Sequence, residues 1–348
     1  MKSFTIGAIE IGIDKPVLVI PEIGINHNGS LEVAKRMVDA AANAGASLVK
    51  HQTHIVEDEM SHAARSVVPG NSTKSIYDVM AECALSEAEE KELMDYAHSK
   101  GLIFISTPFS RAAANRLEKF GVLAFKIGSG EMNNYPLIKH IAEFGKPMIV
   151  STGMNTLDSI EKAVAIMERK NVPYALLHTT NLYPTNPEQV RLGAMSQIIE
   201  RFPNVPVGLS DHTLNNNACI AAVALGASIV ERHFTDSKKR IGNDIVCSMD
   251  GNELKELIQG VEEVRVMRGG EKCALANEQV TIDFAFSTAV TIANIKKGDK
   301  FSTENLWVKR PGTGEISAEA YDEILGKVAA CDISSDTHIT RNMVGESS

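Results

Sequence analysis

The chain has 348 residues, too many for one small domain and enough for a large domain followed by a modest second one. Hydrophobic residues make up 44% and charged residues 23%, as in an ordinary globular protein. A net charge of −9 without a basic arm argues against nonspecific binding of nucleic acid, although local lysines can still hold an anionic substrate.

The cysteines and the apolar stretches indicate a cytoplasmic protein. Five cysteines without a CxxC pair fit a reducing compartment and give no disulfide framework or zinc-finger spacing. Residues 1–15 carry charges among their isoleucines and lack the core of a signal peptide. The longest apolar stretch, 218–230, is too short to span a membrane, so we expect no membrane partner.

Short apolar runs alternate with segments of helical periodicity through about 250 residues, the length of a TIM barrel. The predicted strands are 17–22, 47–52, 102–108, 123–131, 147–153, 174–181, 205–212 and 228–233. The predicted helices are 31–45, 86–101, 111–121, 135–147, 156–170, 187–203, 215–227 and 252–270, with Ser30 and Ser86 as N-caps. Eight such repeats predict an α/β fold, a (β/α)8 barrel. The rival open sheet would need a GxGxxG fingerprint after the first strand, which the sequence lacks.

Two segments depart from the repeat. The connection 53–85 is unusually long, and on the catalytic face of a barrel such a loop is more often a binding loop than an idle one. After Gly270 the alternation fails, and short strands with turns follow. We therefore predict a barrel over 1–270, a linker over 271–284 and a small, mostly β module over 285–348. A module of this size is expected to lean on the barrel or on a partner subunit.

Two histidines follow the last two predicted strands, which are neighbours in a closed barrel. His212 and His233 could hold a divalent metal there, with Glu22 across the mouth. A single histidine in such a position is more often a hydrogen-bonded rim residue. The pair, together with Glu22, favours the metal.

Two lysines, Lys50 and Lys126, end the second and fourth strands, where a buried amine is costly unless an anion meets it. The anion could be a carboxylate such as Glu22, or a substrate phosphate or carboxylate. A Schiff-base role for Lys126 is a further option. Hydroxyls and amides that could assist an anion pocket belong to Thr107, Ser129, Asn181 and Ser210.

Other polar residues lie beyond the strand ends. Glu131, Tyr183 and Asp244 could hydrogen-bond a polyhydroxylated substrate, although each by itself is more often a solvated loop residue. Glu231 and Arg232 could pair with each other at the rim.

Many segments in the same order resemble the N-acetylneuraminate (sialic acid) synthase family. They include EIGINHNG, VKHQTHIVEDEM, AFKIGSGE, LSDHT and ERHFT. The resemblance covers nearly the whole chain, and the tail is similar to the antifreeze-like domain of these enzymes. It implies a barrel enzyme that condenses phosphoenolpyruvate with open-chain N-acetylmannosamine, or a close acylated derivative, to give N-acetylneuraminate and phosphate. Legionaminic and pseudaminic acid synthases share this chemistry, so a 2,4-diacetamido-6-deoxy acceptor is the alternative.

The resemblance also assigns residues. It implies a phosphoenolpyruvate pocket of Lys50, Thr107, Lys126, Ser129, Asn181 and Ser210. It implies sugar contacts from Gln52, Asn71, Glu131, Tyr183, Asp244 and Arg310. His212 and His233 correspond to the metal ligands and Glu22 to the catalytic carboxylate beside them. The family suggests Mn2+ or Mg2+, whereas two imidazoles would also suit zinc. Arg310 matches an arginine that reaches the barrel of the other subunit, which implies a domain-swapped homodimer.

The sequence departs from the family pattern at Met132, where a cysteine is common, and at Asn243, where a proline is common. Both lie beside implied sugar contacts, so they bear on the sugar rather than on the reaction. Two rival functions remain: a Schiff-base pyruvate aldolase acting through Lys126, and a non-catalytic sugar- or ice-binding protein.

Overall fold

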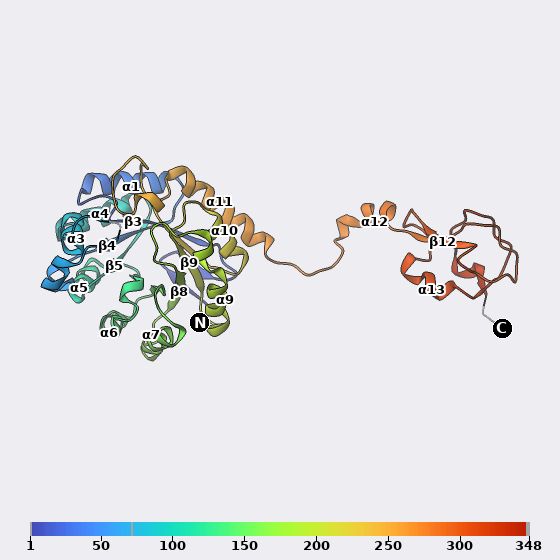
Figure 1. The fold of residues 1–348 in the computed structure, drawn as a ribbon, viewed down its shortest axis with the longest axis horizontal. Helices are drawn as coiled ribbons and strands as arrows, with labels where there is room; N and C mark the ends of the chain where they lie inside the picture. The colour runs from blue at the N-terminus through green and yellow to red at the C-terminus, as the bar shows by residue number, and fades with distance from the viewer. Residues whose placement is uncertain (1, 71, 346–348) are drawn as a thin grey trace. The chain divides into compact units, whose positions relative to one another are not determined.

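A computed structural model of the protein describes residues 2–70 and 72–345. The chain divides into two compact units, residues 1–269 and 270–348. The first unit contains a closed barrel of eight parallel strands, ordered β10-β3-β4-β5-β6-β7-β8-β9 (Figure 1). These strands are β3 Leu18–Gly24, β4 Leu48–Thr53, β5 Ile103–Pro108, β6 Phe125–Ile127, β7 Met148–Ser151, β8 Tyr174–Thr179, β9 Val207–Asp211 and β10 Ile229–His233. The predicted (β/α)8 barrel is confirmed.

The helices surround this barrel and bury their apolar faces against the outward side chains of the strands. They are α1 Leu31–Asn43, α4 Glu87–Ser99, α5 Arg111–Phe120, α6 Tyr135–Ala142, α7 Leu157–Arg169, α8 Pro187–Val190, α9 Leu192–Arg201, α10 Asn217–Ala224 and α11 Gly251–Met267. Ser30 and Ser86 cap α1 and α4 as predicted. The single helix expected over 187–203 is broken at Arg191, whose φ of 54° is left-handed and cannot continue a helix.

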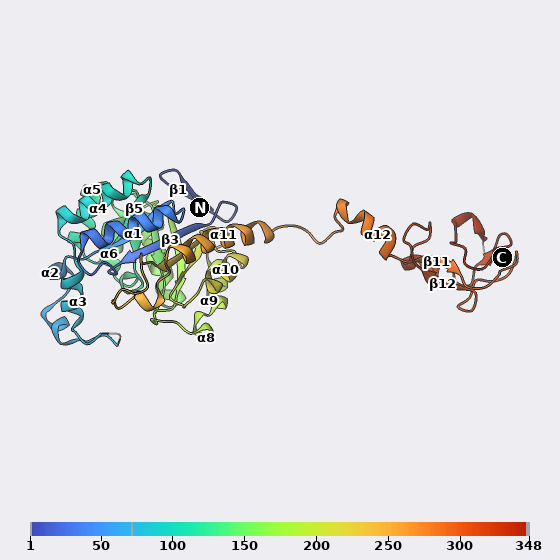
Figure 2. The same ribbon diagram turned by 90° about the horizontal axis from the view of Figure 1, so that it is seen from above.

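An N-terminal hairpin that the sequence patterns did not predict closes one end of the barrel. Strands β1 Ser3–Ile6 and β2 Ile9–Gly12 pair antiparallel. The side chains of Phe4, Ile6 and Ile11 are buried in a cluster with inward-facing residues of the barrel strands. In Figure 2 this hairpin and helices α3 and α8 lie at opposite ends of the barrel. The hairpin therefore plugs the end at which the strands begin.

The long connection after β4 is partly helical. It contains α2 Val56–Glu59, a 3-10 turn at His62–Ser66 and α3 Ile76–Cys83. Val79 and Cys83 of α3 pack on Ile25, just after β3, in a small separate apolar cluster. This contact holds the connection against the end of the barrel at which the strands finish.

The second unit has its own small core, built around strands β11 Thr288–Thr291, β12 Leu306–Lys309, β13 Val328–Ala329 and β14 Val344–Gly345. Its buried residues are Ala289, Ile295, Phe301, Leu306, Ile316, Ile324, Ala329, Ile333 and Ile339. A short helix, α13 Tyr321–Ile324, completes it. The segment predicted as a linker, 271–284, carries a 3-10 turn at Ala276–Glu278 and most of helix α12, Gln279–Ala285. Within the described residues, no helix combines the length and apolarity that a membrane crossing requires.

Candidate active site

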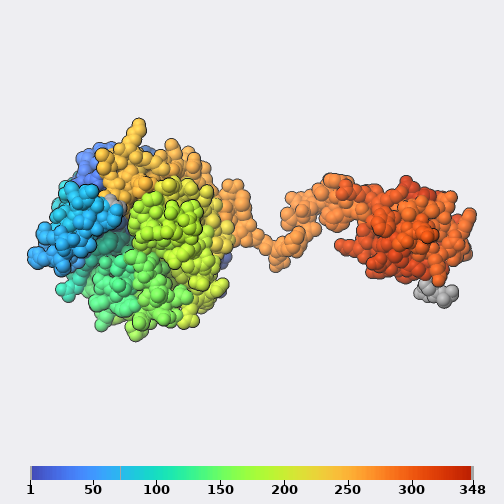
Figure 3. All heavy atoms as spheres, in the orientation of Figure 1, coloured from blue at the N-terminus to red at the C-terminus, as the bar shows by residue number. Residues whose placement is uncertain are grey.

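The carboxyl ends of the barrel strands enclose a polar chamber of about 140 Å³. Parallel strands bring residues that are far apart in the sequence to this one mouth. The predicted site residues that line it are Glu22, Lys50, Gln52, Thr107, Lys126, Ser129, Asn181, Tyr183, Ser210, His212 and His233. In Figure 3 the surface of the first unit is hollowed between the blue segment that follows β4 and the green and yellow segments that follow later strands.

Lys50 makes an ion pair inside the chamber. Its Nζ lies 2.6 Å from Glu22 Oε2 and 3.7 Å from Glu231 Oε1, and it donates a 3.2 Å hydrogen bond to Thr107 Oγ1. Burial lowers the pKa of this amine, but the two carboxylates outweigh burial and hold the pKa above its usual value. Lys50 thus has the carboxylate partner, Glu22, that the sequence analysis gave as one of its two possible anions. Its amine is protonated and positively charged.

Lys126 is the second buried amine of the chamber. Its Nζ donates to Ser151 Oγ at 2.7 Å and lies 3.6 Å from Glu231 Oε1. Burial lowers its pKa to about 8, since the more distant carboxylates compensate only partly and Lys50 adds a like charge. This amine is poorly neutralised by the protein and is ready to receive an anion.

Glu231 and Arg232 do not form the pair that the sequence allowed, because each has other partners. Successive residues of a strand point to opposite faces, so Glu231 faces into the barrel and Arg232 faces the helical shell. Arg232 Nε lies 3.3 Å from Asp211 Oδ2, and its guanidinium also donates to Asn216 Oδ1 at 2.7 Å. Glu231 instead lies between the two lysines, and their charges outweigh burial and lower the pKa of its carboxyl group. It is a site residue that the strand periodicity alone would have identified.

Glu22 lies beside His233, not across the mouth from it, because β3 and β10 are neighbours and these two residues are register partners. Gln52 Nε2 donates to Glu22 Oε1 at 2.8 Å. Burial, helped by the charge of Glu231, raises the pKa of Glu22 to about 7 in spite of Lys50. This carboxyl group is thus fixed in position on both oxygens.

The two imidazoles are close together and neutral. The ring centroids of His212 and His233 are 5.3 Å apart, and Tyr183 lies 4.2 Å from the ring of His212. His212 Nδ1 donates to the carbonyl of Thr180 at 2.8 Å, which leaves Nε2 with its lone pair. Burial and the neighbouring imidazole lower the pKa of His212 to about 4. Burial and the charge of Lys50 lower that of His233 to about 3.

These imidazoles fit a divalent metal as ligands. Both present unprotonated nitrogens, and His233 Nδ1 is buried with no hydrogen-bond partner in the described part of the chain. Among the described residues, no group of three or more His, Cys, Asp or Glu side chains forms a complete protein cage. Remaining coordination positions would therefore fall to substrate and water, as in an open catalytic site.

Three predicted sugar contacts do not line the chamber. Asp244 is buried, not solvated, with Oδ2 3.8 Å from His233 Nδ1. Glu131 follows Ser129 and Gly130 of the lining and accepts a 2.8 Å hydrogen bond from Asn134. Arg310 is exposed in the second unit, directly after β12. A fourth, Asn71, lies outside the described residues.

Further residues of the chamber escaped the sequence patterns. Ser151 receives the hydrogen bond of Lys126, and Thr179 and Phe109 also contribute to the lining. Ser151 is the last residue of β7. Its position at a strand end could have identified it from the sequence as a residue of the chamber. Met132 is one of the two departures from the family pattern. It is fully buried in the hydrophobic core and does not line the chamber.

The fold and the chamber define a TIM-barrel protein with paired amines, carboxylates and imidazoles where its strands end. Residues 37–273 match the NeuB family, and residues 287–345 match the SAF domain. The N,N'-diacetyllegionaminic acid synthase of Campylobacter jejuni is 37% identical over 332 residues, 92% of this chain and 98% of that protein. Human N-acetylneuraminate-9-phosphate synthase is 31% identical over 338 residues, 96% of this chain and 94% of that protein.

Among solved structures, a similar one is the N-acetylneuraminic acid (sialic acid) synthetase of Leptospira borgpetersenii in complex with citrate. It has a TM-score of 0.74 and 31% sequence identity, and the match covers 80% of this chain and 95% of that chain. The chain belongs to the NeuB family. It is a sugar-acid synthase of that family, with a SAF, or antifreeze-like, domain after the barrel.

Proposed function

We propose that the protein condenses phosphoenolpyruvate with an open-chain N-acylated hexosamine aldehyde, of which N-acetylmannosamine is the simplest. The reaction adds water and releases inorganic phosphate to give a nine-carbon 2-keto sugar acid. The single observation that carries this proposal is the chamber in which Lys50 and Lys126 face two carboxylates and two neutral imidazoles. The sugar-acid synthases to which the chain is similar support the substrate class.

The lysines hold the anionic ends of phosphoenolpyruvate. Lys50 is cationic because its pKa is raised. Lys126 has a carboxylate of the protein, Glu231, only at 3.6 Å, and the bound substrate gives it a closer anionic partner. The hydroxyl groups of Thr107, Ser129 and Ser210 and the amide of Asn181 complete the anion site. Two fixed cations orient the enol so that its C3 faces the aldehyde carbon of the acceptor.

The reaction needs no covalent intermediate with the enzyme. C3 of phosphoenolpyruvate forms a bond to the aldehyde carbon, whose oxygen takes up a proton. Positive charge develops at C2, where the Glu22 carboxylate stabilises it. Water adds to C2 and loses a proton. The resulting hydroxyl then gives its proton to the departing phosphate as the C2–O bond to phosphate breaks and the C2 carbonyl forms. Lys126 acts as an anion ligand in this scheme and not as a Schiff base.

A divalent metal held by His212 and His233 would supply Lewis-acid polarisation of the aldehyde oxygen. Mn2+ and Mg2+ are the first ions to test. Low pKa values keep both rings unprotonated through the physiological range, so the metal would not have to compete with protons.

A phosphate-release assay tests the proposal. Purified protein is incubated with phosphoenolpyruvate, Mn2+ and either N-acetylmannosamine or 2,4-diacetamido-6-deoxymannose. We expect acceptor-dependent phosphate release that a chelator abolishes. No release with either acceptor would discard the proposal. Trapping of Lys126 by borohydride with pyruvate, together with activity that resists chelators, would favour the Schiff-base aldolase instead.

We further propose that the working unit is a cytoplasmic, domain-swapped homodimer in which Arg310 of one subunit meets the sugar bound in the other. The exposed position of Arg310 beyond β12 leaves its guanidinium accessible for such a role. Arg310→Ala is expected to raise the acceptor KM about tenfold, the effect of losing one charge-assisted hydrogen bond, and to spare the phosphoenolpyruvate KM. An unchanged acceptor KM would remove the claim.

A further inference from the structure

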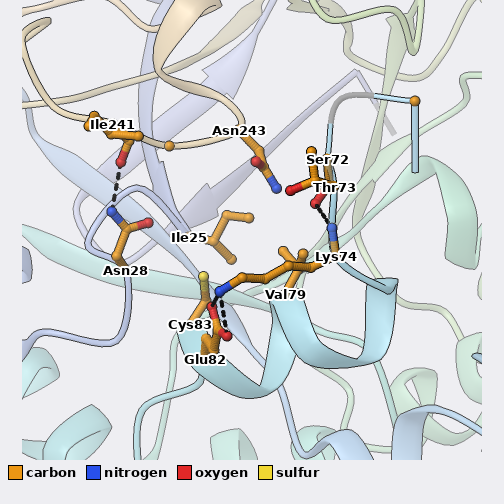
Figure 4. Close-up of a pocket in the computed structure, with 12 residues that line it drawn as sticks. Ile25, Asn28, Ser72, Thr73, Lys74, Val79, Glu82, Cys83, Ile241 and Asn243 are labelled. Carbon is orange, nitrogen blue, oxygen red and sulfur yellow. Dashed lines mark hydrogen bonds and ion pairs between the residues drawn. The ribbon is translucent and has the colours of Figure 1, made fainter. Parts of the chain in front are cut away.

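A second cavity, of about 540 Å³, lies next to the catalytic chamber and has no part in the proposed phosphoenolpyruvate site. Three segments line it: the turn after β3, the long connection after β4 and the loop after β10. Figure 4 shows their side chains converging, with Ile25 at the centre of the view. The chamber itself measures only about 140 Å³, which leaves little room for the far carbons of a hexose beside phosphoenolpyruvate.

Asp244 lies close to both spaces. Its carboxylate lies 3.8 Å from His233 on the chamber side. On the other side, Gly242 and Asn243, which directly precede Asp244 in the chain, line the cavity. Cys83 belongs to the wall of the cavity. A substrate whose aldehyde lies at the imidazoles can therefore extend past Asp244 into the cavity.

The cavity combines an apolar floor with an amide-rich rim. Ile25, Val79 and Cys83 form the floor and are 6%, 6% and 8% exposed. On the rim, Asn243 directs its amide toward the segment that carries Ser72, and Asn28 donates a hydrogen bond to the carbonyl of Ile241 (Figure 4). An acylamino substituent could place its methyl group on the apolar floor and its amide group against the polar rim. A chain of hydroxyl groups would match the apolar floor less well.

The cavity is also electrically balanced. Among the described residues that line it, the only charged ones are Lys74 and Glu82. Lys74 Nζ is 2.6 Å from both carboxylate oxygens of Glu82, so its charge is already matched. A phosphate group on the acceptor would meet no free cation there and would face the Glu82 carboxylate.

We propose that this cavity binds the distal carbons of the acceptor sugar, and that the acceptor carries a second acylamino group and a terminal methyl group in place of free hydroxyls or a phosphate. This inference rests on the proposed function and narrows its substrate. A 2,4-diacetamido-6-deoxymannose has both of these groups and represents the class in the tests below. Asn243, the departure from the family pattern that lies on the rim, contributes to the selection.

The first test compares three acceptors with the unmodified protein. We expect kcat/KM for 2,4-diacetamido-6-deoxymannose to exceed that for N-acetylmannosamine by about tenfold or more, because the floor gains apolar contacts. N-acetylmannosamine 6-phosphate is expected to be about 100-fold poorer than the best acceptor, because its charge is unmatched. A preference for N-acetylmannosamine or for its 6-phosphate would overturn the inference.

The second test changes the cavity alone. Glu82→Gln frees the charge of Lys74 and is expected to raise kcat/KM for the 6-phosphate about tenfold, with the phosphoenolpyruvate KM unchanged. Glu92→Gln is the matched control, since Glu92 pairs with Lys35 at 2.6 Å on the surface and lines no part of the cavity. Equal effects of the two variants, or none from Glu82→Gln, would overturn the inference.

A third variant, Val79→Thr, keeps the side-chain shape and places a hydroxyl in the floor. It is expected to lower about fivefold the ratio of kcat/KM for the diacetamido acceptor to kcat/KM for N-acetylmannosamine. An equal loss for both acceptors would contradict a role in selecting the distal group. If none of the acceptors releases phosphate with the unmodified protein, the proposed function fails. If release occurs but the acceptors and variants behave alike, only this inference fails.

Discussion

The two ends of the barrel interior differ in kind although the same strands build both. On β3, Ile20 lies at the plugged end and Glu22, two residues later, lies in the chamber. On β10, Ile229 and Glu231 repeat the arrangement. Side chains two residues apart on a strand point to the same face, so all four of these side chains point into the barrel. On both strands, the barrel interior therefore changes from apolar to charged between one inward-facing residue and the next.

The difference separates stability from chemistry. The plugged end buries isoleucines and leucines from the strands together with the N-terminal hairpin, which stabilises the fold by removing apolar surface from water. The open end holds Lys50, Lys126, Glu22 and Glu231, whose desolvation is unfavourable and is only partly offset by mutual attraction. Variants at the two ends should therefore affect different quantities.

The largest effect is expected at the open end. Lys126→Met should lower kcat/KM by about 1,000-fold, since a charge-assisted contact to a bound anion is lost, and should leave the free energy of unfolding unchanged or raised. Steady-state kinetics and urea denaturation measure the two quantities. Lys146→Met, on the outer surface near Glu118, is the control and should retain activity. A strong loss of stability in Lys126→Met would break the separation.

The imidazole pair should behave in the same way. His233→Ala is expected to weaken Mn2+ binding by at least about 100-fold, because one of two protein ligands is removed. Calorimetric titration of the metal-free protein measures this directly. His140→Ala, on α6, serves as the control. Full manganese affinity in His233→Ala would contradict the ligand assignment.

The plugged end should give the opposite pattern. Ile11→Ala removes a fully buried side chain of the hairpin and is expected to lower the free energy of unfolding by about 2–4 kcal/mol. The fraction that remains folded at 25 °C should keep its kcat/KM. Thermal denaturation and kinetics on the same sample check both expectations. A kcat/KM that falls with the stability would show that the two ends are coupled.

The smallest effect concerns pH. Because burial holds the pKa of Lys126 at about 8, below its usual value, this amine loses its proton as the pH rises through 8. Only the protonated form attracts phosphoenolpyruvate, so the affinity should decline above pH 8, by up to about tenfold per pH unit. Titrations between pH 7 and 9.5 measure the slope. Lys126→Met should show no such decline, and a flat profile in the unmodified protein would be inconsistent with the low pKa.

Much of the fold followed from local patterns. Each of the eight apolar runs became a strand, and Ser30 and Ser86 cap their helices, because these signals act over a few residues. Most of the predicted site residues also line the chamber, since a closed barrel gathers its strand ends wherever they stand in the sequence. The hairpin β1–β2 was missed, because its role depends on the barrel end that it covers.

The sequence by itself determined the strand–helix repeat, the polar character of the strand ends and the acidic composition, all of which reside in short segments of chain. Only the tertiary structure decided which groups became partners. It turned Glu231 toward two lysines and away from Arg232, placed Glu22 beside His233, and buried Asp244 close to the same imidazole. The physical reason is that ion pairing, desolvation and cavity shape depend on distances across the closed barrel, which no local pattern contains.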